Sequence, residues 1–222
     1  MGPSVLRTYV TNTLDDPFVE ENSLGSWYQP ITDARRAANK AKAEEDILVV
    51  IGNPPYKEKS HGKGGWMEHG SEGTTPPMED FFPEREWHVG THTKHLYNAY
   101  IYFWRWATWK VFDHHEPSDR GVVCFITVSG FLNGQGFQGM RKYLRATSDE
   151  IWVIDCSPEG FTPVVSTRVF EAMRHEVCIT LAVRTGATSR DQPASVHYRT
   201  LAPGHRRDKF VELEKIRLQD DA

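Results

Sequence analysis

The feature that most constrains the fold is a pair of continuous apolar runs separated by one long apolar segment. The runs are "DILVVIGN" (46–53) and "GVVCFITV" (121–128), and the segment between them is "LYNAYIYFWRWATWKVF" (96–112). An unbroken apolar run is typical of a strand that is buried on both faces of a parallel sheet. The longer segment has the length of a helix and is apolar almost all round, so it should be buried as well. The sequence therefore predicts parallel strands joined through a buried helix.

Further periodic segments extend this pattern. We expect helices at 33–45, 136–147 and 206–218, and strands at 6–14, 150–157, 176–185 and 194–201. Strands that alternate with helices predict an open α/β sheet with helices on both faces. Because no helical pattern separates residues 150–157 from 176–185, we expect these strands to form an antiparallel pair at one edge of a mostly parallel sheet. Residues 57–95 are polar and glycine-rich, which predicts a long surface loop.

Composition limits the partners and the compartment. The chain has 222 residues and a formal net charge of −4, so a polyanion such as DNA must be met by local basic patches rather than by the whole surface. No apolar run approaches the ~18 residues that a membrane span needs. The three cysteines are far apart within apolar runs, which indicates buried thiols. We expect a cytoplasmic protein with no membrane contact.

The first apolar run ends in the tetrapeptide "NPPY", Asn53 to Tyr56. In open α/β sheets, ligands bind beyond the carboxyl ends of the strands, where this tetrapeptide should lie. Prolines lack a backbone donor, so the loop offers acceptors: the Asn53 side-chain oxygen and a carbonyl around Pro54. Two acceptors aimed at one point suit an amino group, and the Tyr56 ring offers a flat face for stacking. The pattern predicts a holder for the exocyclic amine of a nucleobase, which becomes a better nucleophile toward an electrophilic methyl group.

Together with other segments, this tetrapeptide resembles a known family. "NPPY" after an apolar strand is similar to motif IV of the amino-group methyltransferases that use S-adenosylmethionine. "YNAYIYFWRWATWKVF", "GVVCFITVSGFLNGQGFQGMRKYLR", "IWVIDCSPEG" and "TRVFEAMRHEVCITLAVRTG" resemble the adenine-N6 DNA methyltransferase module of type ISP and type IIG single-chain restriction–modification enzymes. The resemblance covers most of the chain. It implies a Rossmann-like methyltransferase fold, double-stranded DNA as substrate and S-adenosylmethionine as methyl donor.

The resemblance also implies roles for single residues. By position, Asn53 and Pro54 would hold the target amine, and Pro55 would belong to the same catalytic loop. Tyr56 would stack on the flipped base. Phe170 falls where such enzymes place a second aromatic ring against the base, although a phenylalanine of the core would fit the same pattern.

The part of the module that binds the donor is only partly recognisable. Asn12 in "TNTL" falls where relatives carry an aspartate that touches the adenine amine of the donor, so we assign Asn12 to cofactor binding. The Gly-rich donor loop is not recognisable, because "GKGGW" (62–66) follows no strand and "GQGFQG" (134–139) follows the wrong one. The resemblance therefore implies an incomplete Rossmann-like module, with residues 1–202 as part of the catalytic domain and 203–222 as a helical extension or linker. We expect it to be inactive without upstream and downstream segments of a larger restriction–modification polypeptide.

Three functions are compatible with these features. The favoured one is site-specific adenine-N6 methylation of DNA in a restriction–modification system. A protein glutamine-amide methyltransferase also uses "NPPY", and a non-catalytic remnant that binds DNA or a partner chain would also lack the donor loop. We expect no metal site, because His88, His92 and His95 lie in an irregular segment without a cysteine or carboxylate beside them. The basic runs "RRAANKAK" and "RRDK" suit either phosphate contact or a solvated face.

Overall fold

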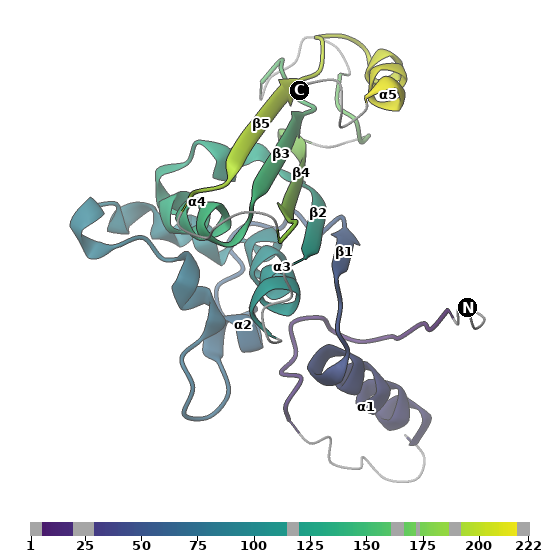
Figure 1. The fold of residues 1–222 in the computed structure, drawn as a ribbon, viewed down its shortest axis with the longest axis vertical. Helices are drawn as coiled ribbons and strands as arrows, with labels where there is room; N and C mark the ends of the chain where they lie inside the picture. Colours follow the sequence, from purple (N-terminus) through teal and green to yellow (C-terminus); the bar gives the residue numbers. More distant parts are fainter. Residues whose placement is uncertain are drawn as a thin grey trace.

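The computed structural model describes residues 6–19, 29–114, 120–160, 167–171, 174–186 and 192–216. In these residues a five-stranded sheet has the order β1-β2-β4-β3-β5. The strands are β1 (Val49–Gly52), β2 (Gly121–Val128), β3 (Glu150–Asp155), β4 (Val177–Arg184) and β5 (Ser195–Thr200). The longer helices are α1 (Gln29–Glu44), α3 (Ala99–Thr108), α4 (Gln138–Thr147) and α5 (Arg206–Lys215). Helix α1 lies at the end of the molecule remote from β5 (Figure 1).

Four strands of the sheet run in one direction, and β4 runs against them. β1 is parallel to β2, and β3 is parallel to β5, whereas β4 lies between β2 and β3 and is antiparallel to both. The predicted mostly parallel α/β sheet is confirmed, and so is the antiparallel pairing of residues 150–157 with 176–185. The predicted position of this pair at an edge is wrong, because β5 adds a strand beyond β3.

The main core lies on one face of the sheet, beneath α3 and α4. Side chains of a strand point alternately to its two faces, and in β2 every second position from Gly121 to Thr127 is buried. Phe125 of β2 packs edge-on against Trp104 of α3, with ring centroids 5.0 Å apart. Leu144 of α4 and Val153 of β3 belong to the same apolar cluster. The predicted buried helix at 96–112 is therefore confirmed as α3, which continues through a π-helical turn, Trp109–Asp113.

The opposite face of the sheet is covered only in part by the described residues. Its half-buried apolar side chains come from three central strands: Val122, Cys124 and Ile126 of β2, Ile179 and Leu181 of β4, and Trp152 and Ile154 of β3. At one end of this face, a small cluster around Cys156 and Val177 packs against Leu213 of α5. Helices therefore cover the two faces unequally within the described part.

The predicted surface loop at 57–95 is a compact series of short helices instead. It contains α2 (Trp66–His69) and the 3₁₀ segments Pro77–Phe81, Arg85–Trp87 and Gly90–Tyr97. Met67 and Phe81 are fully buried in the main core. Short turns of this kind do not repeat every 3.6 residues, so their apolar side chains show no helical period in the sequence.

Two apolar segments predicted as strands are less buried than expected. Residues 6–12 form no strand, and Leu6 and Val10 are 94% and 84% exposed. β1 was expected to be buried on both faces but is an edge strand, in which Val49 and Ile51 are 52% and 76% exposed. A strand at the edge of a sheet has a hydrogen-bonded neighbour along one edge only, so its side chains are less covered. Among the described residues, β2 is the one strand that pairs with β1. No described helix is long and apolar enough to cross a membrane.

Candidate active site

The NPPY loop begins where β1 ends, at Gly52. This glycine lies against the ring of Phe125 on β2, and a Cβ atom added to it would be 2.9 Å from Phe125 Cε1. After it, Asn53 and Pro55 are exposed and Pro54 is buried. The loop therefore presents the Asn53 side chain at the carboxyl end of a parallel strand, which is the usual place for a ligand in an open α/β sheet.

We expect Gly52→Ala to lower the free energy of unfolding by about 1–3 kcal/mol, the usual cost of overpacking. The new methyl group would push on the Phe125 ring, which already packs edge-on against Trp104. Urea unfolding measures the effect. Gly90→Ala is the matched control, because nothing lies within 4 Å of the added Cβ there. Equal stability of the two variants would contradict the proposed close approach.

Asn53 and Tyr56 are held together by a direct hydrogen bond. The Tyr56 hydroxyl donates to Asn53 Oδ1 at 2.5 Å and lies 3.4 Å from the carbonyl oxygen of Ile126. Burial raises the pKa of Tyr56 to about 12, so the hydroxyl keeps its proton and acts as a donor at neutral pH. An amide oxygen accepts two hydrogen bonds. Asn53 Oδ1 is therefore oriented by Tyr56 and has a second lone pair available for a ligand N–H.

The structure brings the two predicted aromatic residues to the same small cluster. Tyr56 and Phe170 are both half-buried and pack against the group formed by Cys156, Val169 and Val177. Tyr56 also packs against the main core, so its ring lies where the two clusters meet. The stacking role of both rings stays a prediction.

A cavity of about 310 Å³ lies next to the NPPY loop. Besides β1 and the loop itself, it is lined by Thr13, Phe103, Trp106 and Phe125. The Trp106 indole N–H is buried and has no hydrogen-bond partner among the described residues. Phe103 and Trp106 were not predicted from the sequence. Their spacing of three residues, which places them on one face of α3, is the signal that points to them.

Asn12 lies near this cavity, but its side chain closes a turn. Its Nδ2 donates to Asp15 at 2.7 Å, and its Oδ1 accepts from the backbone N–H of Leu14 at 3.2 Å. Lys42 Nζ donates to its carbonyl oxygen at 2.8 Å. The neighbouring Thr13 lines the cavity in its place. The segment "TNTL" therefore does lie beside "NPPY", whereas a contact from Asn12 to the donor stays a prediction.

The other motifs noted in the sequence do not gather at this loop. His88 follows one 3₁₀ segment, and His92 and His95 lie in the next. No group of three metal-ligating side chains occurs among the residues that the structure describes. In the basic run of α1, Arg35 and Arg36 pair with aspartates.

Comparisons with known proteins agree with this architecture. The family model described as Eco57I restriction-modification methylase matches residues 7–161. The ATP-dependent type ISP restriction-modification enzyme LlaBIII bound to DNA aligns with 93% of the chain at a TM-score of 0.68 and 22% identity. The DrdV–DNA complex aligns with 96% of it at 0.65 and 20% identity. A nuclease-deletion mutant of the type ISP enzyme LlaGI, in complex with a DNA substrate mimic, aligns with 89% at 0.64 and 20% identity.

These matches carry different weight. The chain spans 13%, 20% and 16% of the LlaBIII, DrdV and LlaGI chains, respectively. At such low identity, the likeness to these structures shows the fold alone. No curated protein matches the sequence significantly. The family model, however, covers more than half of the chain, including β1, the NPPY loop, α3 and β2. The chain therefore belongs to the Eco57I restriction-modification methylase family.

Proposed function

We propose that the chain is the catalytic part of an adenine-N6 DNA methyltransferase in a restriction–modification system. One observation carries the proposal: Asn53 is exposed at the carboxyl end of β1, with its amide oxygen oriented by Tyr56. This arrangement suits an exocyclic amine as ligand. Because the chain belongs to a restriction-modification methylase family, we take this amine to be that of a DNA base.

The geometry supports a simple mechanism. The target adenine must leave the duplex to reach the loop, at a cost of a few kcal/mol. Stacking on Tyr56 offsets part of this cost, by about 1–3 kcal/mol per base. The two N–H groups of the amine then donate hydrogen bonds. One goes to Asn53 Oδ1, through its remaining lone pair, and the other goes to the Pro54 carbonyl oxygen. S-adenosylmethionine, when bound, supplies the electrophilic methyl group. These two hydrogen bonds draw the nitrogen lone pair out of conjugation with the adenine ring. The amine can therefore attack the methyl group without a general base to deprotonate it first.

The described residues fit only part of the donor. The cavity beside the NPPY loop is lined by the aromatic residues Phe103, Trp106 and Phe125 and by Thr13. None of its lining residues is a carboxylate that could hold ribose hydroxyls, and none is a cation that could hold the methionine carboxylate. We therefore propose that this cavity holds only part of S-adenosylmethionine. Another segment would hold the ribose and the methionine carboxylate.

We accordingly expect the 222-residue chain alone to bind S-adenosylmethionine weakly or not at all. Isothermal titration calorimetry with micromolar donor should give no measurable heat of binding. The control is the same chain joined to an upstream segment that carries a Gly-rich donor loop, which should bind. Micromolar affinity of the chain alone would contradict the incomplete-site proposal.

The sheet supports a larger polypeptide as partner. β1 exposes Val49 and Ile51 at an edge where no other described strand pairs with it, and the apolar residues of the second sheet face are half-buried. An open apolar edge of this kind invites further pairing, and an apolar surface left partly bare is typical of an interaction site. We place upstream and downstream segments of a restriction–modification polypeptide against this edge and face. Because its substrate is DNA, we assign the assembly to the cytoplasm.

Direct product analysis tests the proposed function. The chain, joined to the upstream segment, is incubated with duplex DNA and methyl-labelled S-adenosylmethionine, and the nucleosides are then separated by mass spectrometry. We expect the label in N6-methyladenine. Label in a methylated cytosine would overturn the choice of base, and label in a protein glutamine would favour an amide methyltransferase. DNA binding without any transfer would favour a non-catalytic remnant.

A further inference from the structure

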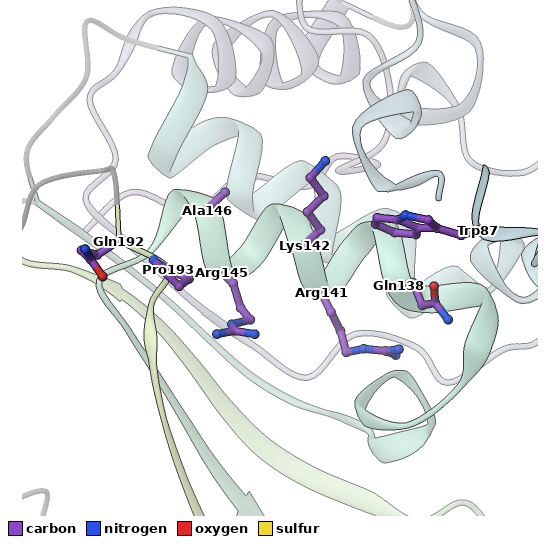
Figure 2. A pocket seen from close by; sticks show the side chains of 8 residues that line it. All are labelled: Trp87, Gln138, Arg141, Lys142, Arg145, Ala146, Gln192 and Pro193. Carbon is purple, nitrogen blue, oxygen red and sulfur yellow. The ribbon is translucent and has the colours of Figure 1, made fainter. Parts of the chain in front are cut away.

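A basic groove runs along α4, outside the NPPY loop. Its volume is about 590 Å³, and Figure 2 shows the side chains that line it. Its polar and aromatic lining consists of Trp87, Gln138, Arg141, Lys142, Arg145 and Gln192, and we call this surface the α4 groove. Helix α4 reads "QGMRKYLRAT" and contains three cations and no acidic residue. In a chain whose formal net charge is −4, this is a marked local excess of positive charge.

Two of the three cations are not neutralised by carboxylates of the described residues. Arg141 Nη1 donates to the carbonyl oxygens of Phe131 and Gly134, both at 2.7 Å. Burial lowers the pKa of Arg141, and no carboxylate of the described residues counters that effect. Arg145 is exposed, and its side chain makes no ion pair or hydrogen bond within the described part. Neutral carbonyls thus anchor Arg141, while its charge and that of Arg145 are left for an external anion.

The third cation lies on the other side of the helix. Lys142 forms an ion pair with Glu84, and its ammonium group lies 5.7 Å from the centre of the Trp87 ring. In Figure 2, Arg141 and Arg145 point to one side of α4 and Lys142 points to the opposite side. The lysine is therefore held at the rim of the α4 groove by a single exposed carboxylate.

The spacing of the two arginines suits a linear anion. Residues four apart on a helix lie about 5–6 Å from each other at their Cβ atoms. Each guanidinium group is a planar fork that matches the oxygens of a phosphate. Two such forks in a row along the helix axis fit successive phosphates of a backbone better than one compact anion.

We propose that the α4 groove holds the phosphodiester backbone of duplex DNA, at a site separate from the NPPY loop. This inference rests on the proposed function, because that function makes duplex DNA the polyanion. Contacts to phosphates fix the position of a protein on the duplex and carry no direct sequence information. The groove therefore positions the duplex, while the choice of target base is made elsewhere.

Binding of the full chain to a short fluorescent duplex, followed by anisotropy at several salt concentrations, tests the proposal. Arg145→Gln should lower the slope of log affinity against log salt by about 1, equally for duplexes of different sequence. Glu84→Gln should act in the opposite direction and tighten binding, because it frees Lys142. Lys215→Gln, on an exposed position of α5 outside both basic runs, removes the same charge and should leave binding unchanged.

The outcomes separate this inference from the function on which it rests. If the wild-type chain and Arg145→Gln bind the duplex with the same slope of log affinity against log salt, the proposed role of the α4 groove is overturned. The methyltransferase proposal would then still stand. An equal effect of Lys215→Gln would mean that only the net charge matters, and it would also overturn the proposal for the α4 groove. Displacement of the duplex by micromolar free nucleoside triphosphate would identify a nucleotide site instead. A wild-type chain that binds no duplex at any salt concentration would overturn the α4 groove, whereas the methyltransferase proposal is tested separately by product analysis on the joined chain.

Discussion

Replacing Asn53 by alanine is expected to lower methyl transfer about 10²–10³-fold, the range seen when one hydrogen-bonding group that acts on the transition state is removed. The side chain is exposed, and among the described residues its hydrogen-bond partner is Tyr56, so the variant should fold normally. Its oxygen acts on the reacting amine and not on the duplex backbone, so duplex affinity should stay unchanged. Single-turnover transfer and anisotropy, measured on the chain joined to its donor-binding segment, provide the two readouts.

Two further variants make this result specific. Asn53→Asp keeps an oxygen that accepts from both Tyr56 and the amine, so it should retain more activity than the alanine variant. Asn133→Ala makes the same chemical change at an exposed asparagine that follows β2 and lines a different cavity, and it should transfer at the wild-type rate. Equal losses from Asn53→Ala and Asn53→Asp would show that the acceptor role is wrong. A normal rate in Asn53→Ala would remove the residue from the mechanism.

The strands and helices with a clear period were predictable, because one-dimensional patterns determine them. The run at 121–128 is bounded by Gly121 and Ser129, and the observed strand β2 covers the same residues. The position of β1 at an edge was not predictable. An apolar run shows that its side chains need cover, but not which segment supplies it, and here the described chain supplies cover on one side only. The antiparallel pair was misplaced for a related reason, since the partner of β3 on its far side depends on where β5 inserts.

The candidate site was predictable in its residues and not in its contacts. "NPPY" points to Asn53 and Tyr56 from sequence alone, and their role stays a prediction; the hydrogen bond between them depends on the loop conformation, which no residue pattern gives. Thr13 and Trp106 reach the same cavity from segments that are far apart in the sequence. The three cations of "RKYLR" (141–145) can be read directly from the sequence. Their importance appears only when α4 separates Arg141 and Arg145 from Lys142 and leaves the two arginines without a carboxylate partner among the described residues.

Tyr56 should respond very differently to loss of its ring and loss of its hydroxyl. Tyr56→Ala removes the stacking face, worth about 1–3 kcal/mol per base, and also disturbs the junction of two clusters. Transfer should therefore fall by about 10²-fold or more. Tyr56→Phe keeps the face and loses one hydrogen bond to Asn53, worth about 0.5–1.5 kcal/mol. Transfer should then fall by about 2–10-fold. Duplex DNA with 2-aminopurine at the target position reports base flipping directly, because its fluorescence is bright when unstacked and quenched against an aromatic ring.

A double-mutant cycle identifies the route by which the Tyr56 hydroxyl acts. If the hydroxyl works only by orienting Asn53, then Tyr56→Phe should cost nothing further once Asn53 is alanine, and the two losses should not add. Quenching of 2-aminopurine should survive in both single variants that keep the aromatic ring, Asn53→Ala and Tyr56→Phe, and disappear in Tyr56→Ala. Equal damage from Tyr56→Phe and Tyr56→Ala would mean that the hydroxyl, and not the ring, sets the rate. If the probe stayed dark in Tyr56→Ala as well, no base would leave the duplex, and a glutamine amide would replace the flipped base as the substrate of this loop, because an amide acceptor has no duplex to open.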